Sequence, residues 1–220
     1  MNLSLEAWRQ AILYVIAFIL SVSVHEFGHA WVATRLGDAL PRSQGRLTLN
    51  PRHHIDPIGT LVFPLLMAFG AAPLAWGRPV WTNPANYTRR LRRSTGSMLV
   101  AIAGPIMNLI LAALVSAFIV VGVRVGFLST ALAEALVKFL VSLNLSLMFF
   151  NLLPIPPLDG GAVLAWLLPR SMQGVVEFLS RWGFLILVGL MMTGTLATVM
   201  SPAYRVIHVW TETLWGLAGV

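Results

Sequence analysis

The residues best suited to chemistry are the two histidines and the glutamate of a His-Glu-x-x-His motif, His25, Glu26 and His29. On a helix, residues four apart share a face, so the imidazoles of His25 and His29 can converge on one metal ion. Glu26 lies beside that face, where its carboxylate can take a proton from a water at the ion rather than bind the ion. The spacing favours metal-assisted hydrolysis. The alternative is a His-Glu-His cluster satisfied by packing inside a helical bundle.

A catalytic zinc site needs a third protein ligand and an open position. The chain has no cysteine, so this ligand must be a histidine or a carboxylate. Asp159 is the strongest candidate because prolines in residues 154–157 end a helix, and Gly160 permits a tight turn after it. His54 and Asp56, in a second polar cluster, are other candidates. The remaining acidic and histidine residues considered are better explained as caps or surface charges: Asp38, Glu134, Glu177 and His208.

The composition indicates that these residues are positioned by membrane helices. The 220 residues are 57% hydrophobic and only 10% charged, with a mean hydropathy of +0.79. A soluble fold cannot bury so much apolar surface. The net charge of +7 comes from arginines that cluster between apolar runs, which suits anionic lipid better than nucleic acid. The N-terminus lacks the pattern of a signal peptide and is expected to be a retained membrane segment.

The apolar runs predict an all-α polytopic membrane protein, a helical bundle of about 4–6 membrane segments. We expect a single integral-membrane domain over residues 1–220, with a core at 7–165 and a C-terminal membrane helix and interfacial tail at 172–220. The clearest runs are residues 11–33, 98–123, 136–153 and 183–200, and residues 203–220 favour an interfacial helix.

Loop charge favours a re-entrant segment at residues 58–76, because the loops on either side of it, 34–56 and 77–96, are both rich in arginine. If residues 58–76 crossed the membrane, these two basic loops would face opposite sides. Residues 45–50 alternate polar and apolar side chains, including Leu47, Thr48 and Leu49, which predicts a strand. An ordinary surface hairpin is the alternative for this stretch.

Three motifs occur in an order that resembles a known family. They are the HEFGH sequence at 25–29, Gly104-Pro105-x-x-Asn108, and Asn151-x-x-Pro154-x-x-Pro157-Leu158-Asp159-Gly160. Together they resemble the site-2 protease family of intramembrane zinc metallopeptidases, over residues 20–165. The match is to its small bacterial branch, without a PDZ domain or a nucleotide-binding module. An Asn-Pro-x-x-His-Ile-Asp-Pro stretch at residues 50–57 is similar to one in the same branch.

The resemblance implies one Zn²⁺ per chain, held by His25, His29 and Asp159, with Glu26 as the general acid and base. It also implies that Asn108 and Asn151 lie at the site and contact substrate. Residues 42–52 would correspond to a short re-entrant β-segment near the active site. The free edge of the strand at Leu47, Thr48 and Leu49 would pair with an unwound substrate.

The expected function is hydrolysis of peptide bonds in transmembrane or membrane-proximal segments, by a multi-pass protein of the cell membrane whose active site faces the cytoplasmic side. The expected partners are a transmembrane protein substrate and membrane lipids, with no nucleic acid; an oligomer or an adaptor protein stays open. Three alternatives remain: a metal-ion transporter, a catalytically inactive adaptor, and a membrane metalloprotease acting on soluble peptides. A transporter would not need a glutamate between its ligands.

Overall fold

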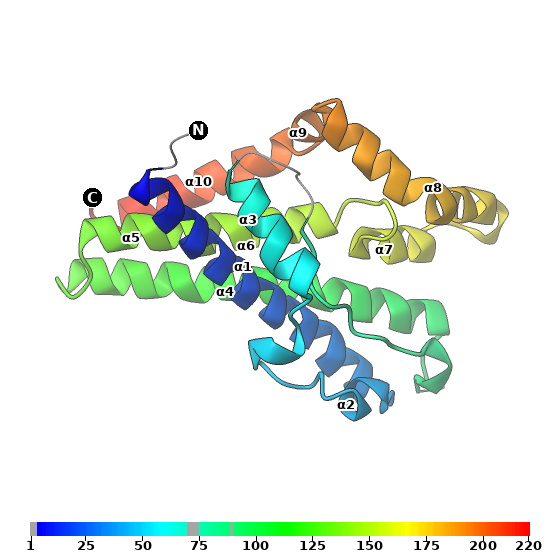
Figure 1. Ribbon diagram of the computed structural model, residues 1–220. Helices are drawn as coiled ribbons and strands as arrows, with labels where there is room; N and C mark the ends of the chain where they lie inside the picture. Colours follow the sequence, from blue (N-terminus) through cyan, green and yellow to red (C-terminus); the bar gives the residue numbers. More distant parts are fainter. Residues whose placement is uncertain (1–3, 70–74, 89) are drawn as a thin grey trace.

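The chain folds into α-helices joined by loops in the computed structural model, which describes residues 4–69, 75–88 and 90–220 (Figure 1). The α-helices are α1 (Leu5–Arg35), α2 (Leu40–Ser43), α3 (Phe63–Ala68), α4 (Arg93–Arg124), α5 (Thr130–Leu136), α6 (Ser142–Asn151), α7 (Asp159–Leu167), α8 (Gln173–Met192), α9 (Thr195–Val199) and α10 (Ser201–Ala218). Short 3₁₀ turns lie at Pro51–His53, Pro84–Asn86 and Arg170–Met172, and π-helical turns at Pro57–Val62 and Val137–Val141. The prediction of an all-helical protein is confirmed.

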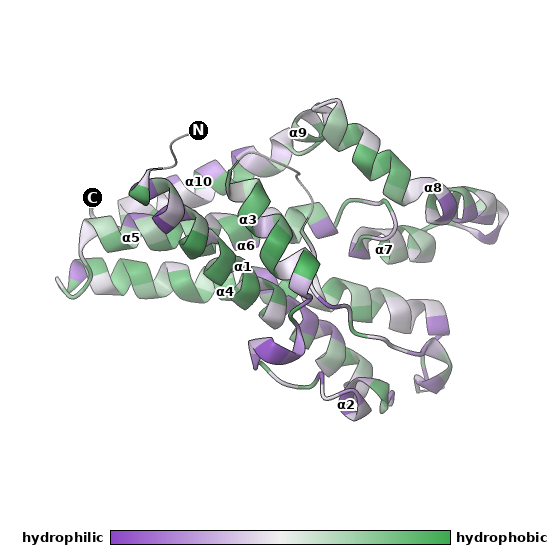
Figure 2. Ribbon diagram, in the orientation of Figure 1, coloured by the Kyte–Doolittle hydropathy of each residue, from purple (hydrophilic) through white to green (hydrophobic). Residues whose placement is uncertain are grey.

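Four helical stretches in the described residues are long and apolar enough to cross a membrane, namely Leu5–Arg35, Arg93–Arg124, Thr130–Asn151 and Arg170–Met192. Figure 2 shows hydrophobic residues along these helices, whereas hydrophilic residues gather on α2 and the loops beside it. The predicted run at 183–200 is wrong in its bounds. The helix starts earlier and ends at Met192, because Gly194 adopts a left-handed φ of 73° that ends it.

Helix α1 crosses α4 at close range, and His25 and His29 of the motif lie at this crossing (Figure 1). Small residues line the buried faces of both helices, among them Ala30 and Ala33 on α1 and Ala103 and Gly104 on α4. Without large side chains between them, the two backbones approach closely, which is the usual basis of helix packing in membranes. Side chains on α1 can therefore reach groups on α4 directly.

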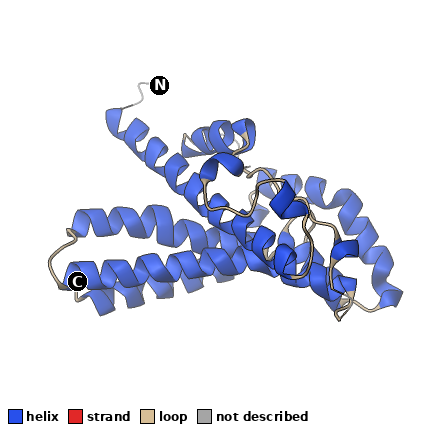
Figure 3. Ribbon diagram, turned by 90° about the horizontal axis from the view of Figure 1, so that it is seen from below, coloured by secondary structure: helices blue, strands red, loops and turns tan. Residues whose placement is uncertain are grey.

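Beyond the crossing, α4 packs against the continuous α5–α6 stretch and α10, which run side by side in Figure 3. Their shared core contains Ile119, Val141, Leu145, Ile207 and Leu214. The tail predicted to be interfacial therefore forms a helix that packs lengthwise against α4 and α6; its place relative to the membrane surface stays a prediction.

The two ends of the segment predicted to be re-entrant lie together. Its helical part, Pro57–Met67, is apolar but too short to cross a bilayer. The backbone N–H of Trp76 donates to the carbonyl of Gly59 at 3.1 Å, and the Thr60 hydroxyl donates to the carbonyl of Trp76 at 2.9 Å. Residues 70–74 of this segment lie outside the described residues. The two ends of the segment are therefore in contact, and its re-entry into the membrane stays a prediction.

The predicted strand at residues 45–50 is wrong: the described residues contain no strand there (Figure 3). Gly45 adopts a φ of 68°, and the N–H of Arg46 donates to the carbonyl of Pro41, which closes a turn after α2. The N–H of Thr48 then donates to the carbonyl of Arg46 at 2.9 Å. Alternation of polar and apolar residues fits the two-residue period of a strand, but a strand also needs a neighbouring strand with which to pair. Among the residues that the structure describes, this loop has no such neighbour.

Candidate metal centre

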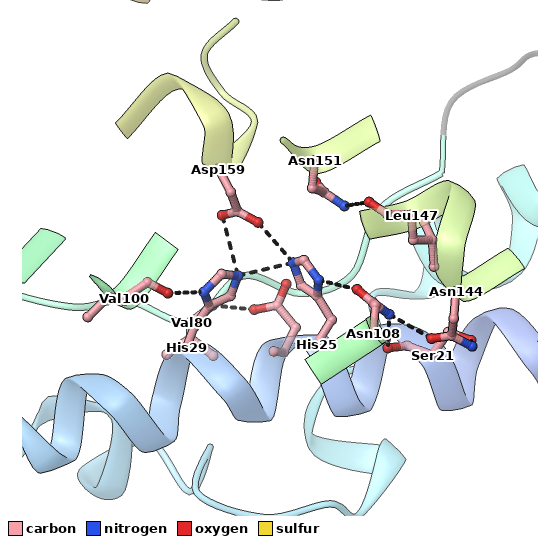
Figure 4. A network of polar contacts seen from close by, with 11 residues as sticks. Ser21, His25, His29, Val80, Val100, Asn108, Asn144, Leu147, Asn151 and Asp159 are labelled. Carbon is pink, nitrogen blue, oxygen red and sulfur yellow. Dashed lines mark hydrogen bonds and ion pairs between the residues drawn. The ribbon is translucent and has the colours of Figure 1, made fainter. Parts of the chain in front are cut away.

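The motif histidines project from one face of α1 toward α4 and α7 (Figure 4). His25 is buried, and its Nε2 lies 3.0 Å from Nε2 of His29. The two rings meet edge to face, with their centroids 4.7 Å apart. This arrangement follows from the four-residue spacing on an uninterrupted helix. It leaves one nitrogen of each ring facing the same point.

Asp159 reaches that point from the first turn of α7. Its Oδ2 lies 3.2 Å from Nε2 of His25, and its Oδ1 lies 3.4 Å from Nε2 of His29. The loop before α7 is tightly folded: a Cβ on Gly160 would collide with the carbonyl oxygens of Leu152 and Leu153. Glycine at position 160 therefore allows the end of α6 to pass close to the start of α7, and this close passage aims the carboxylate at the histidines.

The hydrogen bonds around this cluster show that it fits a cation. Nδ1 of His29 lies 2.7 Å from the carbonyl of Val100, which can only accept, so this nitrogen carries the proton. Nδ1 of His25 similarly lies 2.6 Å from Oδ1 of Asn108. In neutral rings both Nε2 atoms are therefore unprotonated, and Oδ2 of Asp159 is buried without a hydrogen-bond partner. Three electron-pair donors thus face one another with no proton among them.

The spacing of these donors matches a small divalent ion. The three ligand atoms all lie within 4.8 Å of one another, and this is the group of metal-ligating side chains found among the described residues. A tetrahedral zinc with bonds of about 2.0–2.1 Å places its ligands roughly 3.3 Å apart. Two imidazoles and one carboxylate are also a donor set that catalytic zinc uses.

Glu26 lies beside the three ligand atoms and lines the same cavity, which has a volume of about 610 Å³. Its Oε2 accepts a hydrogen bond of 3.0 Å from the backbone N–H of Val80. Val80 belongs to the irregular stretch 75–83, which passes over α1 and also lines the cavity. Glu26 is thus held next to the cluster by a backbone donor and is not one of the three converging ligands.

Several known proteins are similar to this chain in sequence. Residues 121–190 match the model of peptidase family M50. The chain is 37% identical over 192 residues to "Putative zinc metalloprotease YwhC" of Bacillus subtilis, an alignment that covers 86% of this chain and 84% of the relative. It is 35% identical over 189 residues to "Putative zinc metalloprotease Rip2" of Mycolicibacterium smegmatis, covering 84% of this chain and 68% of the relative. The chain belongs to peptidase family M50, the site-2 proteases. No solved structure matches it.

Membership of the M50 family confirms the resemblance drawn from the motifs. This M50 protein is an intramembrane zinc metallopeptidase, and its membrane-length helices make it a multi-pass membrane protein.

The two asparagines that the motifs single out have different surroundings in this M50 peptidase. Asn151 lines the cavity, and its side-chain amide donates to the carbonyl of Leu147 at 2.9 Å, which leaves its oxygen free for another donor. Asn108 is fully buried and lies behind His25. It therefore contacts His25 rather than the cavity.

The loop residues predicted to bind substrate do not line the cavity. Leu49 is 55% exposed, and the carbonyl of Thr48 receives a hydrogen bond from His54. Residues 75–82 stand against the cavity instead, with Gly77, Pro79 and Val80 among its lining residues. The sequence of this stretch shows a basic loop between apolar runs, and nothing in its pattern signals that it folds over the histidines.

The other candidate metal ligands, His54 and Asp56, make hydrogen bonds that stabilise their own loop. Burial lowers the pKa of His54, and Nε2 of its neutral ring donates to the carbonyl of Thr48 at 2.8 Å. Oδ1 of Asp56 accepts from the N–H groups of Ile58 and Gly59, which caps the start of the Pro57–Val62 turn. Neither side chain joins the cluster of His25, His29 and Asp159.

Gly104 belongs to the Gly-Pro-x-x-Asn motif, and the structure shows why a glycine is needed there. A Cβ at this position would lie 2.5 Å from Nε2 of His29 and 2.6 Å from Cε1 of His25. Glycine thus lets α4 pass directly against both imidazoles. We expect Gly104→Ala to displace the rings and to weaken zinc binding by at least about tenfold, as changes next to metal ligands do.

The matched control for this substitution is Gly189→Ala on α8, where an added Cβ meets open space. In a helix interior, alanine is otherwise more stable than glycine by about 0.5–1 kcal/mol. Zinc affinity measured by chelator competition should therefore fall only for Gly104→Ala. Equal affinity for both variants would show that the rings tolerate the methyl group.

Proposed function

We propose that this M50 peptidase cleaves peptide bonds in transmembrane or membrane-proximal segments, with His25, His29 and Asp159 as zinc ligands and Glu26 as general acid and base. The observation that carries the proposal is the convergence of these four side chains at one cavity between membrane-length helices. Residues 1–220 would act as one integral-membrane domain. Zinc, when bound, polarises the scissile carbonyl and lowers the pKa of a water toward about 7.

Residues of the chain itself would carry out the proton transfers of the reaction. Glu26 takes a proton from the attacking water and returns it to the leaving amine, which balances the hydrolysis. The N–H of Val80 holds one oxygen of Glu26, so the other oxygen is the one that faces the reaction. Asn151, on the cavity wall, has a side chain able to position the substrate or to stabilise the developing oxyanion.

The substrate must be locally unwound before attack, because a transmembrane helix has its carbonyls hydrogen-bonded internally. An extended peptide in the cavity would lie beside residues 75–82. The loop at Leu47, Thr48 and Leu49 would contribute a strand only by pairing with the substrate itself, since no partner strand lies among the described residues. We therefore expect cleavable segments to carry Gly, Pro or Asn near the scissile bond.

The arginine-rich loop that follows α1 supports an active site toward the cytoplasmic side. The motif lies in the second half of α1, next to Arg35, Arg42, Arg46 and Arg52, and such loops stay on the cytoplasmic face. Anionic lipid headgroups would contact the same loop. A transmembrane protein is the proposed substrate.

The test uses the full chain in liposomes with a transmembrane substrate and two variants of it. Replacing Gly or Pro near the cut with Leu should slow cleavage severalfold, because the helix then unwinds less readily. A soluble peptide with the same scissile sequence serves as the comparison. Faster cleavage of the soluble peptide, with no effect of the Leu replacements, would favour a membrane metalloprotease that acts on soluble peptides.

A further inference from the structure

A buried chain of hydrogen bonds runs from His25 through Asn108 and Asn144 to Ser21 (Figure 4). Oδ1 of Asn108 lies 2.6 Å from Nδ1 of His25, and Nδ2 of Asn108 donates to Oδ1 of Asn144 at 2.7 Å. Nδ2 of Asn144 in turn donates to the hydroxyl of Ser21 at 2.8 Å. Asn108, Asn144 and Ser21 are each fully buried. Two asparagines and a serine are thus fully removed from solvent, which is costly unless every polar atom is paired.

The direction of each bond can be assigned from the far end of the chain. The Ser21 hydroxyl donates to the carbonyl of Ala17 at 2.7 Å, so its oxygen accepts from Asn144. Nδ2 of Asn144 also donates to the carbonyl of Leu140, which uses both of its hydrogens. The remaining atom of that amide, Oδ1, must then face Asn108 as an acceptor.

The same reasoning fixes the amide of Asn108. Its Nδ2 donates to Oδ1 of Asn144 and to the carbonyl of Ser21 at 3.3 Å, so both of its hydrogens are used. Its Oδ1 therefore faces His25 and can only accept. Nδ1 of His25 must carry the proton, and Nε2 is left as a free electron pair aimed at Asp159. A flipped Asn108 would present an N–H group to Nδ1 and would move the ring proton to Nε2.

We propose that Asn144 and Ser21, acting through Asn108, form a positioning relay that holds His25 in the metal-binding tautomer and so sets the zinc affinity. This proposal rests on the zinc site proposed above. The relay closes a ring through α1, α4 and α6 and returns to α1 one turn before His25. Asn144 and Ser21 contact neither the ligand atoms nor the cavity, so they act on the metal only through Asn108.

The decisive substitution is Asn144→Leu, which removes the nearer of the two acceptors that keep Asn108 from flipping and leaves only the Ser21 carbonyl at 3.3 Å. Zinc affinity should fall about 10–100-fold, the usual effect of losing a partner behind a metal-bound histidine. Asn144→Asp is the conservative variant, because a carboxyl group buried without a cation stays protonated. Its carbonyl oxygen can accept from Asn108 and its hydroxyl can donate to Leu140. Its zinc affinity should stay within about threefold of wild type.

The matched control is Ser116→Ala, which removes another buried hydroxyl from the same bundle. Ser116 accepts a hydrogen bond of 3.0 Å from the indole N–H of Trp210 and donates to the carbonyl of Ala112. Its loss should lower thermal stability and leave zinc affinity unchanged. Ser21→Ala, a milder change within the relay, should weaken zinc binding less than Asn144→Leu does.

Each variant is measured in two ways, on the full chain in detergent. Chelator competition gives the zinc dissociation constant. The ¹⁵N chemical shifts of labelled histidine in the zinc-free protein report which ring nitrogen of His25 carries the proton, with His25→Ala assigning the signal. Wild type and Asn144→Asp should show protonated Nδ1, and Asn144→Leu should show a population with protonated Nε2. A merely structural role would change thermal unfolding without changing the tautomer.

The relay is overturned if folded Asn144→Leu keeps the wild-type zinc affinity and tautomer, or if Asn144→Asp is as weak as Asn144→Leu. Either result would leave the zinc site itself intact, provided that His25→Ala loses the metal. If His25→Ala kept the wild-type zinc affinity, that result would contradict both the proposed zinc site and the relay.

Discussion

Glu26→Gln should abolish measurable proteolysis while leaving bound zinc unchanged. Removing a general acid and base typically costs about 10²–10⁴-fold in rate. Glu26 lies outside the three atoms that converge on the ion, and glutamine can still accept the hydrogen bond from the N–H of Val80. The variant should therefore keep its fold and its metal. Cleavage of a transmembrane substrate in liposomes, together with zinc analysis of the same sample, provides the measurement.

The matched control is Glu6→Gln, the same change on the same helix at an exposed position far from the site. It should cleave at the wild-type rate. A metal transporter would respond differently, since transport needs ligands rather than a proton carrier. Retained proteolysis in Glu26→Gln would mean that another group handles the proton. Loss of zinc in this variant would mean that Glu26 is itself a ligand.

Asp159→Ala should remove most of the zinc affinity and, with it, the activity. Structural zinc sites with four protein ligands bind the ion with about 10–16 kcal/mol, so one ligand contributes roughly 2.5–4 kcal/mol, or about 10²–10³-fold in affinity. The loss has a direct physical cause: the two Nε2 atoms of His25 and His29 remain, but they lack the carboxylate that completes the set. Chelator competition on the purified protein measures it.

Two variants of the loop that follows α2 serve as controls for Asp159→Ala. Asp56→Ala removes the cap of the Pro57–Val62 turn, and His54→Ala removes a buried ring that is hydrogen-bonded to the carbonyl of Thr48. Both should destabilise this loop and still bind zinc. If His54→Ala lost the metal while Asp159→Ala kept it, the ligand set drawn here would be wrong.

The sequence determined the chemistry because the histidines lie close together along the chain. A four-residue spacing on a helix places His25 and His29 together whatever else the protein does. The proline and glycine residues around Asp159 indicated an irregular stretch after a membrane helix. Irregular backbone inside a membrane is energetically costly unless it is buried in protein or lines a water-filled cavity. These local signals also predicted the helical class, since long apolar runs allow few structures in a bilayer.

The tertiary structure decided which distant groups support that site. Val100 contributes a backbone carbonyl, which no side-chain pattern can reveal, and Asn144 is one polar residue in an apolar run until α6 is placed against α4. The alternation at 45–50 predicted a strand that did not form, whereas residues 75–82, for which no role at the site was predicted, line the cavity. The physical reason is the distance along the chain over which each effect applies. Helix geometry places residues three or four apart on one face, whereas contacts between distant segments depend on how whole helices pack.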